Sequence, residues 1–374
     1  MSADSSEARR GLQRGKKKLA HLIELSEGRK SFLAQTHDYP DPDTIASALG
    51  LTWLMETLGR MDAQIGYGGA VGRAENRAMI RVLNIKLRKI TPAEMAKFDL
   101  VALLDTQPDC SNHSLPDDLI PDIVVDHHFL REIKGPKPPF LDVGGGVGTT
   151  STKVAELVRA SGVEPPANVA TALFYGLKSD TLDLSRVSTP ADIESYLYLF
   201  ERIDRKLLSE IEHPQLPLEW FRVFNKAIER GRIYGQFIVA DLGDVYTPDL
   251  CAEVADRLLQ IEGIRHALAT GWYEGGLFLS LRTRSRRFNA GRILHGLVNE
   301  MDIGGGAGGH RQMAGARLPA DMRSERARRD LRRAIVGNVL EAFGEDQRHF
   351  HRMMTRTDAE RPSARPSRPT APPD

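Results

Sequence analysis

Short apolar segments alternate with helical patterns along most of the chain. The apolar segments of strand length cover 31–37, 63–69, 98–106 and 122–128. Segments with apolar residues at helical spacing cover 44–60, 73–87, 150–162 and 166–181. Because strands that alternate with helices form parallel sheets, this pattern predicts an α/β domain with a parallel sheet and helices on both of its faces.

A second alternating unit follows a long helical region over 192–231, which is interrupted at 213–219. Its strands are predicted at 235–243, 264–275 and 276–284, and its helices at 247–263, 290–301 and 323–343. We therefore expect two domains, a first α/β domain over 31–205 and a smaller α/β domain over 234–345, joined by a helical linker over 206–233. A basic helix over 1–30 precedes them, and the Pro- and Arg-rich tail over 354–374 is expected to be disordered.

The composition is that of a globular protein, with 41% hydrophobic and 27% charged residues. The net charge of +1 indicates no overall attraction to nucleic acids or membranes. The two cysteines, Cys110 and Cys251, exclude a disulfide scaffold and a cysteine-based zinc site. The N-terminal segment lacks an apolar signal core, and no apolar run is long enough to span a bilayer. We expect a cytoplasmic protein without a membrane partner.

Acidic and histidine residues follow three of the predicted strands and one predicted helix. The stretches are THDYPDPD at 36–43, LLDTQPD at 103–109, VVDHHF at 124–129 and LKSDTLD at 177–183. Ligands of open parallel sheets bind outside the carboxyl ends of the strands. We therefore expect one edge of the sheet to gather a set of donor residues, namely His37, Asp41, Asp43, Asp105, Asp126, His127, His128 and Asp180.

A set of carboxylates and imidazoles without thiolates suits Mn²⁺, Mg²⁺, Co²⁺ or Fe²⁺ better than structural Zn²⁺. Two divalent cations, about 3.5–4 Å apart and bridged by an aspartate, would neutralise the carboxylates and activate a water. Each stretch also has a simpler interpretation, because an aspartate after a strand is often a helix cap or a turn residue. The four stretches together favour a metal site.

These motifs resemble those of the DHH phosphoesterase superfamily. VVDHH carries its signature, THDYPDPD has the His-x₃-Asp-x-Asp spacing of its first motif, and LLDTQ and LKSDT resemble its second and fourth motifs. The segment GGAGGHRQMAGARL, at 305–318, resembles the glycine-rich signature of the DHH-associated domain. The nearest branch contains oligoribonucleases, 3′-phosphoadenosine-5′-phosphate phosphatases and cyclic-dinucleotide phosphodiesterases.

The resemblance implies a role for each donor residue. The implied metal ligands are His37, Asp41, Asp43, Asp105, His127 and Asp180. Asp43 would share one ion with His37 and Asp41, Asp105 would bridge both ions, and His127 and Asp180 would complete the second site. His128 would face the scissile phosphate, and Asp126 would orient the neighbouring histidines. The chain departs from the family at Pro42 and Leu182, where a glycine is usual.

The second domain offers candidate substrate contacts. Of the arginines in the segment 280–292, Arg282 resembles the family's substrate-contacting arginine, whereas the others also suit a solvated sheet edge. Gly308, Gly309 and His310 resemble the loop that holds the substrate's far end, although a tight turn needing positive φ explains the glycines equally. The glycine run that begins at Gly144 lacks a Walker lysine. We expect it to begin a helix capped by Thr150 or Ser151.

The expected function is metal-dependent hydrolysis of phosphodiester or phosphomonoester bonds in small nucleotides or short oligonucleotides, with the active site in the cleft between the domains. Two divalent cations are expected, Mn²⁺ being favoured, with Mg²⁺ and Co²⁺ as alternatives. Two other functions stay open: hydrolysis of polyphosphate or pyrophosphate at the same metal centre, and a non-catalytic nucleotide sensor. A homodimer also stays open.

Overall fold

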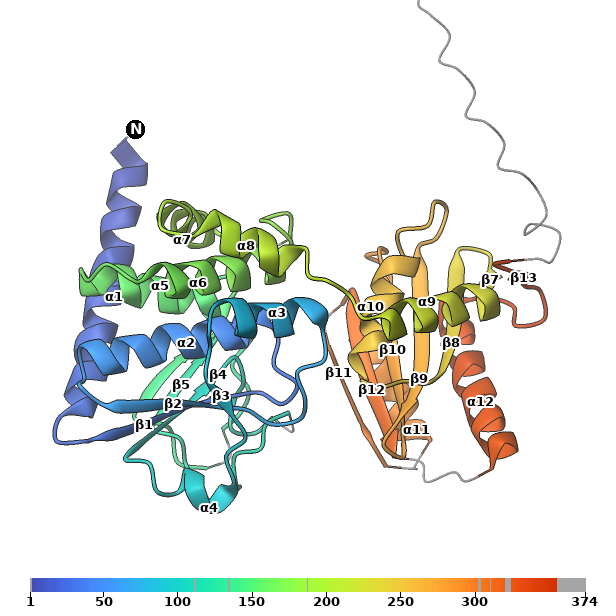
Figure 1. The fold of residues 1–374 in the computed structure, drawn as a ribbon, viewed down its shortest axis with the longest axis horizontal. Helices are drawn as coiled ribbons and strands as arrows, with labels where there is room; N and C mark the ends of the chain where they lie inside the picture. Colours follow the sequence, from blue (N-terminus) through green and yellow to red (C-terminus); the bar gives the residue numbers. More distant parts are fainter. Residues whose placement is uncertain are drawn as a thin grey trace, which may run out of the picture. The chain divides into compact units, whose positions relative to one another are not determined.

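The computed structural model describes residues 2–110, 112–133, 135–186, 188–301, 304–309, 311–319 and 324–354. It divides into two compact units, Met1–Gln215 and Leu216–Asp374, and each has its own sheet and hydrophobic core (Figure 1). His310 and the tail beyond residue 354 lie outside the described residues.

The first unit contains a six-stranded sheet in which every pair of neighbouring strands is parallel. Its spatial order is β3 (Leu87–Arg88), β2 (Asp62–Gly66), β1 (Ser31–Thr36), β4 (Leu100–Leu104), β5 (Ile123–Asp126) and β6 (Phe140–Val143). The four predicted strands are β1, β2, β4 and β5. The edge strands β3 and β6 were not predicted, because β3 has only two residues and β6 is mostly half-buried, with Asp142 interrupting its apolar residues. Strands β2 and β3 are added on one side of β1, and β4, β5 and β6 on its other side. The switch point of the strand order therefore lies between β1 and β4, which is the usual position of a ligand site in such sheets.

The helices of the first unit are α1 (Ser2–Ser26), α2 (Pro42–Thr57), α3 (Ala74–Val82), α4 (Pro92–Met95), α5 (Thr150–Ser161), α6 (Ala167–Asp180), α7 (Pro190–Phe200) and α8 (Arg205–Glu212). Alternate residues of β1 face opposite sides: Phe32 and Ala34 join the core that includes α2, α5 and α6, and Leu33 joins the other core. The predicted fold class is confirmed, although among the described residues the second face is covered by the short α4 and by loop residues such as Leu115.

The second unit contains a mixed seven-stranded sheet in which only β8 and β9 are parallel neighbours. Its order is β11 (Gly306–Gly309), β12 (Met313–Pro319), β10 (Gly276–Thr283), β9 (His266–Tyr273), β8 (Phe237–Asp244), β7 (Arg232–Tyr234) and β13 (His351–Arg352). One core packs α11 (Ala290–Glu300) and α12 (Glu325–Phe343) on the sheet, and the other packs α9 (Leu218–Arg230) and α10 (Asp249–Leu258). None of the helices in the described part of the chain combines the length and apolar character of a membrane span.

The segment predicted as a helical linker is divided between the two units. Leu208 and Ile211 of α8 belong to the core of the first unit, whereas Trp220 and Val223 of α9 belong to a core of the second. The boundary between the two units, at Gln215–Leu216, lies inside the predicted break of the helical pattern at 213–219. The helices on either side are therefore parts of the two cores, not a separate spacer.

Gly50 of α2 lies where α2 crosses α5 and α6. A Cβ atom at this position would lie 2.7 Å from Val154 Cγ1 and 3.1 Å from Leu173 Cδ2, both on fully buried side chains. We expect Gly50→Ala to lower the free energy of unfolding by about 1–3 kcal/mol, because the core cannot accept the methyl group without a shift. Urea unfolding followed by circular dichroism measures this.

Gly11 of α1 provides the matched control, because no heavy atom lies within 4 Å of the Cβ it would gain. Gly11→Ala should be neutral, or stabilising by up to about 1 kcal/mol through helix propensity. If Gly50→Ala proved as stable as the unsubstituted chain, the close helix crossing would be contradicted.

Candidate metal centre

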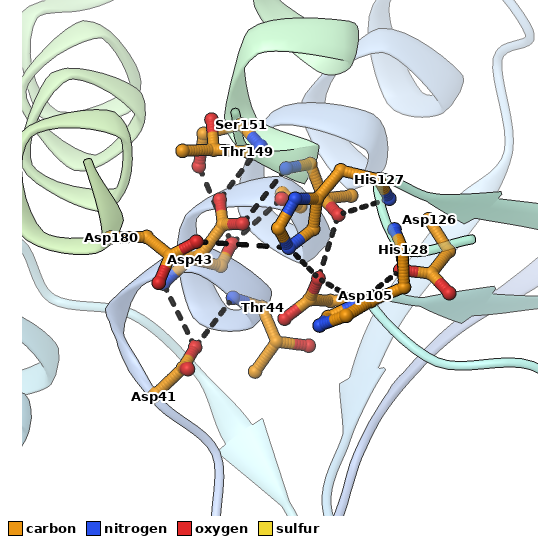
Figure 2. Close-up of polar contacts among 12 residues, drawn as sticks. Asp41, Asp43, Thr44, Asp105, Asp126, His127, His128, Thr149, Ser151 and Asp180 are labelled. Atoms are coloured by element: carbon orange, nitrogen blue, oxygen red, sulfur yellow. Dashed lines mark hydrogen bonds and ion pairs between the residues drawn. The ribbon is translucent and has the colours of Figure 1, made fainter. Parts of the chain in front are cut away.

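The candidate donor residues meet at the carboxyl edge of the first sheet, although they come from distant parts of the sequence (Figure 2). His37 follows β1, Asp105 follows β4, His127 and His128 follow β5, and Asp180 is the last residue of α6. Their donor atoms form three overlapping groups that could each hold a metal ion. The parallel sheet is the reason for this meeting, since it ends all three strands at one edge.

Asp105 lies at the centre of the cluster. Its Oδ2 is 3.6 Å from His37 Nε2, and its Oδ1 is 3.5 Å from His127 Nε2. The hydroxyl of Thr150 donates to Oδ1 at 2.7 Å, which fixes the carboxylate. The backbone of Asp105 is left-handed, with φ of 59°, a conformation that aspartate tolerates better than most residues. Each oxygen of this buried carboxylate therefore faces a different histidine.

The first donor group contains His37, Asp41 and Asp105. His37 Nε2 lies 3.7 Å from Asp41 Oδ1, and its Nδ1 lies 2.9 Å from the carbonyl oxygen of Asp38. A proton on Nδ1, donated to that carbonyl, leaves the Nε2 lone pair free to bind a cation. The ring is thus oriented as a metal ligand.

Asp41 also caps α2, and this explains Pro42. Asp41 Oδ1 accepts from the backbone N–H groups of Asp43 and Thr44 at 3.0 and 3.1 Å. Pro42 occupies the first helical position, where its fixed φ suits the helix and its missing N–H costs no hydrogen bond. The departure from the family's glycine therefore begins the helix that carries Asp43 and is capped by Asp41.

Asp43 belongs to a second donor group, with His127 and Asp180. The family resemblance implied that Asp43 shares a site with His37 and Asp41. In the structure its donor atom lies with those of His127 and Asp180 instead. The backbone N–H groups of Thr150 and Ser151 donate to the two carboxylate oxygens of Asp43, at 2.8 and 2.7 Å. The positive N-terminus of α5 therefore fixes this carboxylate on the side of His127, whose Nε2 is 3.7 Å from Asp180 Oδ2.

The cap of α5 is Thr149, not the predicted Thr150 or Ser151. The Thr149 hydroxyl accepts from the N–H of Thr152 at 2.9 Å. This leaves the next two N–H groups for Asp43 and the Thr150 hydroxyl for Asp105. The sequence feature that could have indicated these supporting residues is the run of hydroxyl side chains at 149–152, directly after Gly148.

His128 and Asp126 form a pair at the edge of the cluster. His128 Nδ1 lies 2.7 Å from Asp126 Oδ1, which agrees with an orienting role for Asp126. Gln107 Nε2 donates to the other oxygen of Asp126 at 2.7 Å and to the carbonyl of Phe129 at 3.1 Å. Gln107 thus holds the Asp126 carboxylate in place. The sequence analysis did not predict this role, although Gln107 is the last residue of the LLDTQ motif.

The electrostatics of the cluster favour bound cations. Burial raises the pKa of Asp43 to about 7, and the charges of Asp180 and Asp41 add to this effect. Burial and the charge of Asp41 raise the pKa of Asp180 to about 6. Burial and the charges of Asp43 and Asp41 raise the pKa of Asp105 well above its ordinary value. These carboxylates and imidazoles are donors that suit a hard or borderline divalent cation, so the residues present fit such a metal.

Leu182, which replaces a family glycine after Asp180, begins a left-handed turn. The φ angles of Leu182, Asp183 and Leu184 are 48°, 55° and 62°, in the region that favours glycine. Hydrogen bonds hold this turn: the Tyr196 hydroxyl donates to Asp183 Oδ1 at 3.0 Å, and the Leu184 N–H donates to the Thr181 hydroxyl at 3.0 Å. The chain thus keeps the backbone conformation without the glycine.

The other predicted site residues belong to the second unit. Arg282 is on β10, where its buried guanidinium donates from Nε to Asp256 Oδ1. Gly308 and Gly309 are on the edge strand β11. Gly309 has a φ of 138°, which confirms the need for glycine there, and a Cβ at Gly308 would meet open space. His310 lies outside the described residues.

Residues 235–337 match the model of the DHHA1 domain. An uncharacterized protein of Methanocaldococcus jannaschii is 34% identical over 338 residues, covering 88% of this chain and 68% of that protein. A "Probable manganese-dependent inorganic pyrophosphatase" of Lactobacillus johnsonii is 26% identical over 171 residues, 44% of this chain, and the chain spans only 52% of that relative.

The structure is similar to that of an exopolyphosphatase-related protein from Bacteroides fragilis. The TM-score is 0.65 at 15% sequence identity, and the match covers 87% of this chain and 95% of the other. At this identity the likeness concerns the fold, and it extends over both units.

The raised carboxyl pKa values predict a pH-dependent response to metal. Between the ordinary pKa of 3.8 and the folded values of about 6 and 7 for Asp180 and Asp43, the metal-free folded chain binds more protons than the unfolded chain. Its free energy of unfolding should therefore fall as pH rises through this window. A cation replaces the protons, so the rise in Tm on adding Mn²⁺ should be larger at pH 8 than at pH 5.5.

Thermal unfolding with MnCl₂ or EDTA at both pH values measures this rise. Asp38→Asn is the matched control, because Asp38 is a neighbouring carboxylate outside the three donor groups and accepts from the Ser114 hydroxyl. It should keep the pH-dependent response. A Mn²⁺-induced shift of the same size at both pH values would contradict the prediction.

Proposed function

We propose that this chain, which belongs to the DHH family of phosphoesterases and carries a C-terminal DHHA1 domain, hydrolyses phosphoester bonds in small nucleotides or short oligonucleotides. The family makes it a metal-dependent phosphoesterase. The nucleotide substrate and the use of two cations are the parts that we add.

The observation that carries the proposal is the position of Asp105 between two donor groups. One of its oxygens lies 3.6 Å from His37 and the other 3.5 Å from His127. His37 is grouped with Asp41, and His127 with Asp43 and Asp180. A carboxylate shared in this way is the arrangement expected of a ligand that bridges two cations.

The six residues His37, Asp41, Asp43, Asp105, His127 and Asp180 would hold the two cations. Mn²⁺ suits the mixture of imidazole and carboxylate donors, and Mg²⁺ and Co²⁺ are the alternatives. When bound, the cations would supply an ionised water at neutral pH and offset the charge of the phosphate oxygens.

His128 would provide the proton for the leaving oxygen. Burial opposes its protonated form, but the hydrogen bond and charge of Asp126 outweigh this effect and raise the pKa of His128. This shift favours the imidazolium, which is the form that a general acid requires. Asp126 holds the ring through Nδ1, at 2.7 Å.

Hydrolysis of pyrophosphate or polyphosphate is the second candidate, favoured by the similarity to the pyrophosphatase of Lactobacillus johnsonii. That similarity covers 44% of this chain, whereas a DHHA1 domain occupies residues 235–337. We favour nucleotides because the glycines of β11, an exposed edge strand of this domain, offer backbone that a larger substrate can approach.

A substrate panel tests the proposal. Purified protein with Mn²⁺ should release mononucleotides from dinucleotides, and EDTA should abolish the release. Phosphate release from pyrophosphate or polyphosphate alone would replace the proposal by the second candidate. Tight binding of a nucleotide without cleavage of any substrate would indicate a sensor.

Asp105→Asn tests the metal centre itself. We expect its kcat to fall by more than about 100-fold, because the bridging charge is lost. Substitution of a residue that only supports a metal ligand typically costs about 10–100-fold. Circular dichroism should show a folded chain, and Asp38→Asn should retain activity. Full turnover in Asp105→Asn would refute the two-cation arrangement.

A further inference from the structure

A cavity of about 360 Å³ opens in the first unit, outside the metal centre. It lies beside the end of β2, the helix α3 and the strand β3. Its lining residues are Tyr67, Ala70, Val71, Arg77, Ile80, Arg81, Leu87 and Lys89. This volume falls within the range of small-molecule sites, roughly 300–1,000 Å³.

The cavity combines positive charge with an apolar and aromatic wall. Three of its lining residues are cationic and none is acidic. Arg77 is anchored by a hydrogen bond from Nη1 to the carbonyl of Gly72, and Lys89 Nζ lies 5.9 Å from the centre of the Tyr67 ring. Three cations gathered without a carboxylate repel each other, so this cavity favours an anion.

The wall of the cavity is hydrogen-bonded to the loop that carries His37 and Asp41. The N–H of Tyr39 donates to the carbonyl of Gly68, next to Tyr67, at 3.2 Å. Asn76 of α3 donates from Nδ2 to the carbonyl of Pro40 at 3.1 Å. Since β2 also pairs in parallel with β1, the cavity and the metal centre lie on the same edge of the sheet.

We propose that this cavity binds a second phosphate-bearing nucleotide unit of the substrate, next to the unit whose phosphate is cleaved. Arg81, Lys89 and Arg77 would bind its phosphate, and Tyr67, Ile80 and Leu87 would contact the base or ribose. The inference rests on the proposed function and narrows it. The preferred substrate carries a second phosphate beyond the scissile one, as a 5′-phosphorylated dinucleotide does.

The test compares two substrates that differ only in the second phosphate: 5′-phosphorylated diadenylate and diadenylate without that phosphate. The full-length chain with Mn²⁺ should prefer the phosphorylated one in kcat/KM. In the double variant Arg81→Ala, Lys89→Ala this preference should fall roughly tenfold or more, through KM, since two charge-assisted contacts are lost. Lys86→Ala is the matched control, because Lys86 is an exposed cation of the same segment outside the cavity and contacts Asn84.

Binding supplies a readout independent of turnover. Calorimetric titration of the full-length chain with adenosine 5′-monophosphate in EDTA should give a Kd that the double variant raises about tenfold. If the unsubstituted chain cleaves neither dinucleotide, the proposed function fails, and the titration still reports on the cavity. If it cleaves both and the double variant keeps the preference and the Kd, the cavity is not the subsite.

Discussion

The mutual repulsion of buried carboxylates is the constraint on which the first unit depends. Two like charges 4 Å apart repel by about 4 kcal/mol at the effective dielectric of a protein, and here several aspartates share one edge of a sheet. The fold relieves this with partners of opposite charge or dipole. The N-terminus of α5 holds Asp43, the amides of α2 hold Asp41, and the Thr150 hydroxyl holds Asp105. Burial, together with the remaining repulsion, keeps the pKa values of three aspartates high, and bound divalent cations would relieve this condition.

The same sheet edge carries both the candidate metal centre and the cationic cavity. The candidate metal ligands include residues that follow β1, β4 and β5, whereas the cationic cavity follows β2 and includes residues of α3. Hydrogen bonds from Tyr39 and Asn76 connect the two loops without mixing their charges. A phosphate group that bridges the two sites would meet cations on either side, so the edge as a whole is suited to a substrate with more than one phosphate.

Sequence reasoning found the four central strands and brought the donor residues to one edge, because apolar runs of strand length and the rule for parallel sheets suffice for that. It could not find β3, which has two residues, or β6, whose four residues are mostly half-buried and include Asp142. It also missed the loop and helix cover of the second face. The family resemblance placed Asp43 with His37 and Asp41, whereas its donor atom lies in a group with those of His127 and Asp180. The partner of Asp43 is decided by the amides of Thr150 and Ser151, more than a hundred residues later, and no local pattern encodes that contact.

Asp180 shows how this chain supports a ligand where a family glycine is absent. After its helix and the right-handed cap Thr181 come three consecutive left-handed residues, a conformation that costs roughly 1–2 kcal/mol for each residue with a side chain. The turn persists because contacts around it outweigh that cost. Arg186 donates from Nη1 to the carbonyl of Asp180 at 3.2 Å and lies 3.8 Å from its carboxylate, while Tyr196 holds Asp183. The position of the ligand is therefore set by these side chains instead of by the freedom of a glycine, and the departure at Leu182 is compatible with an intact metal centre.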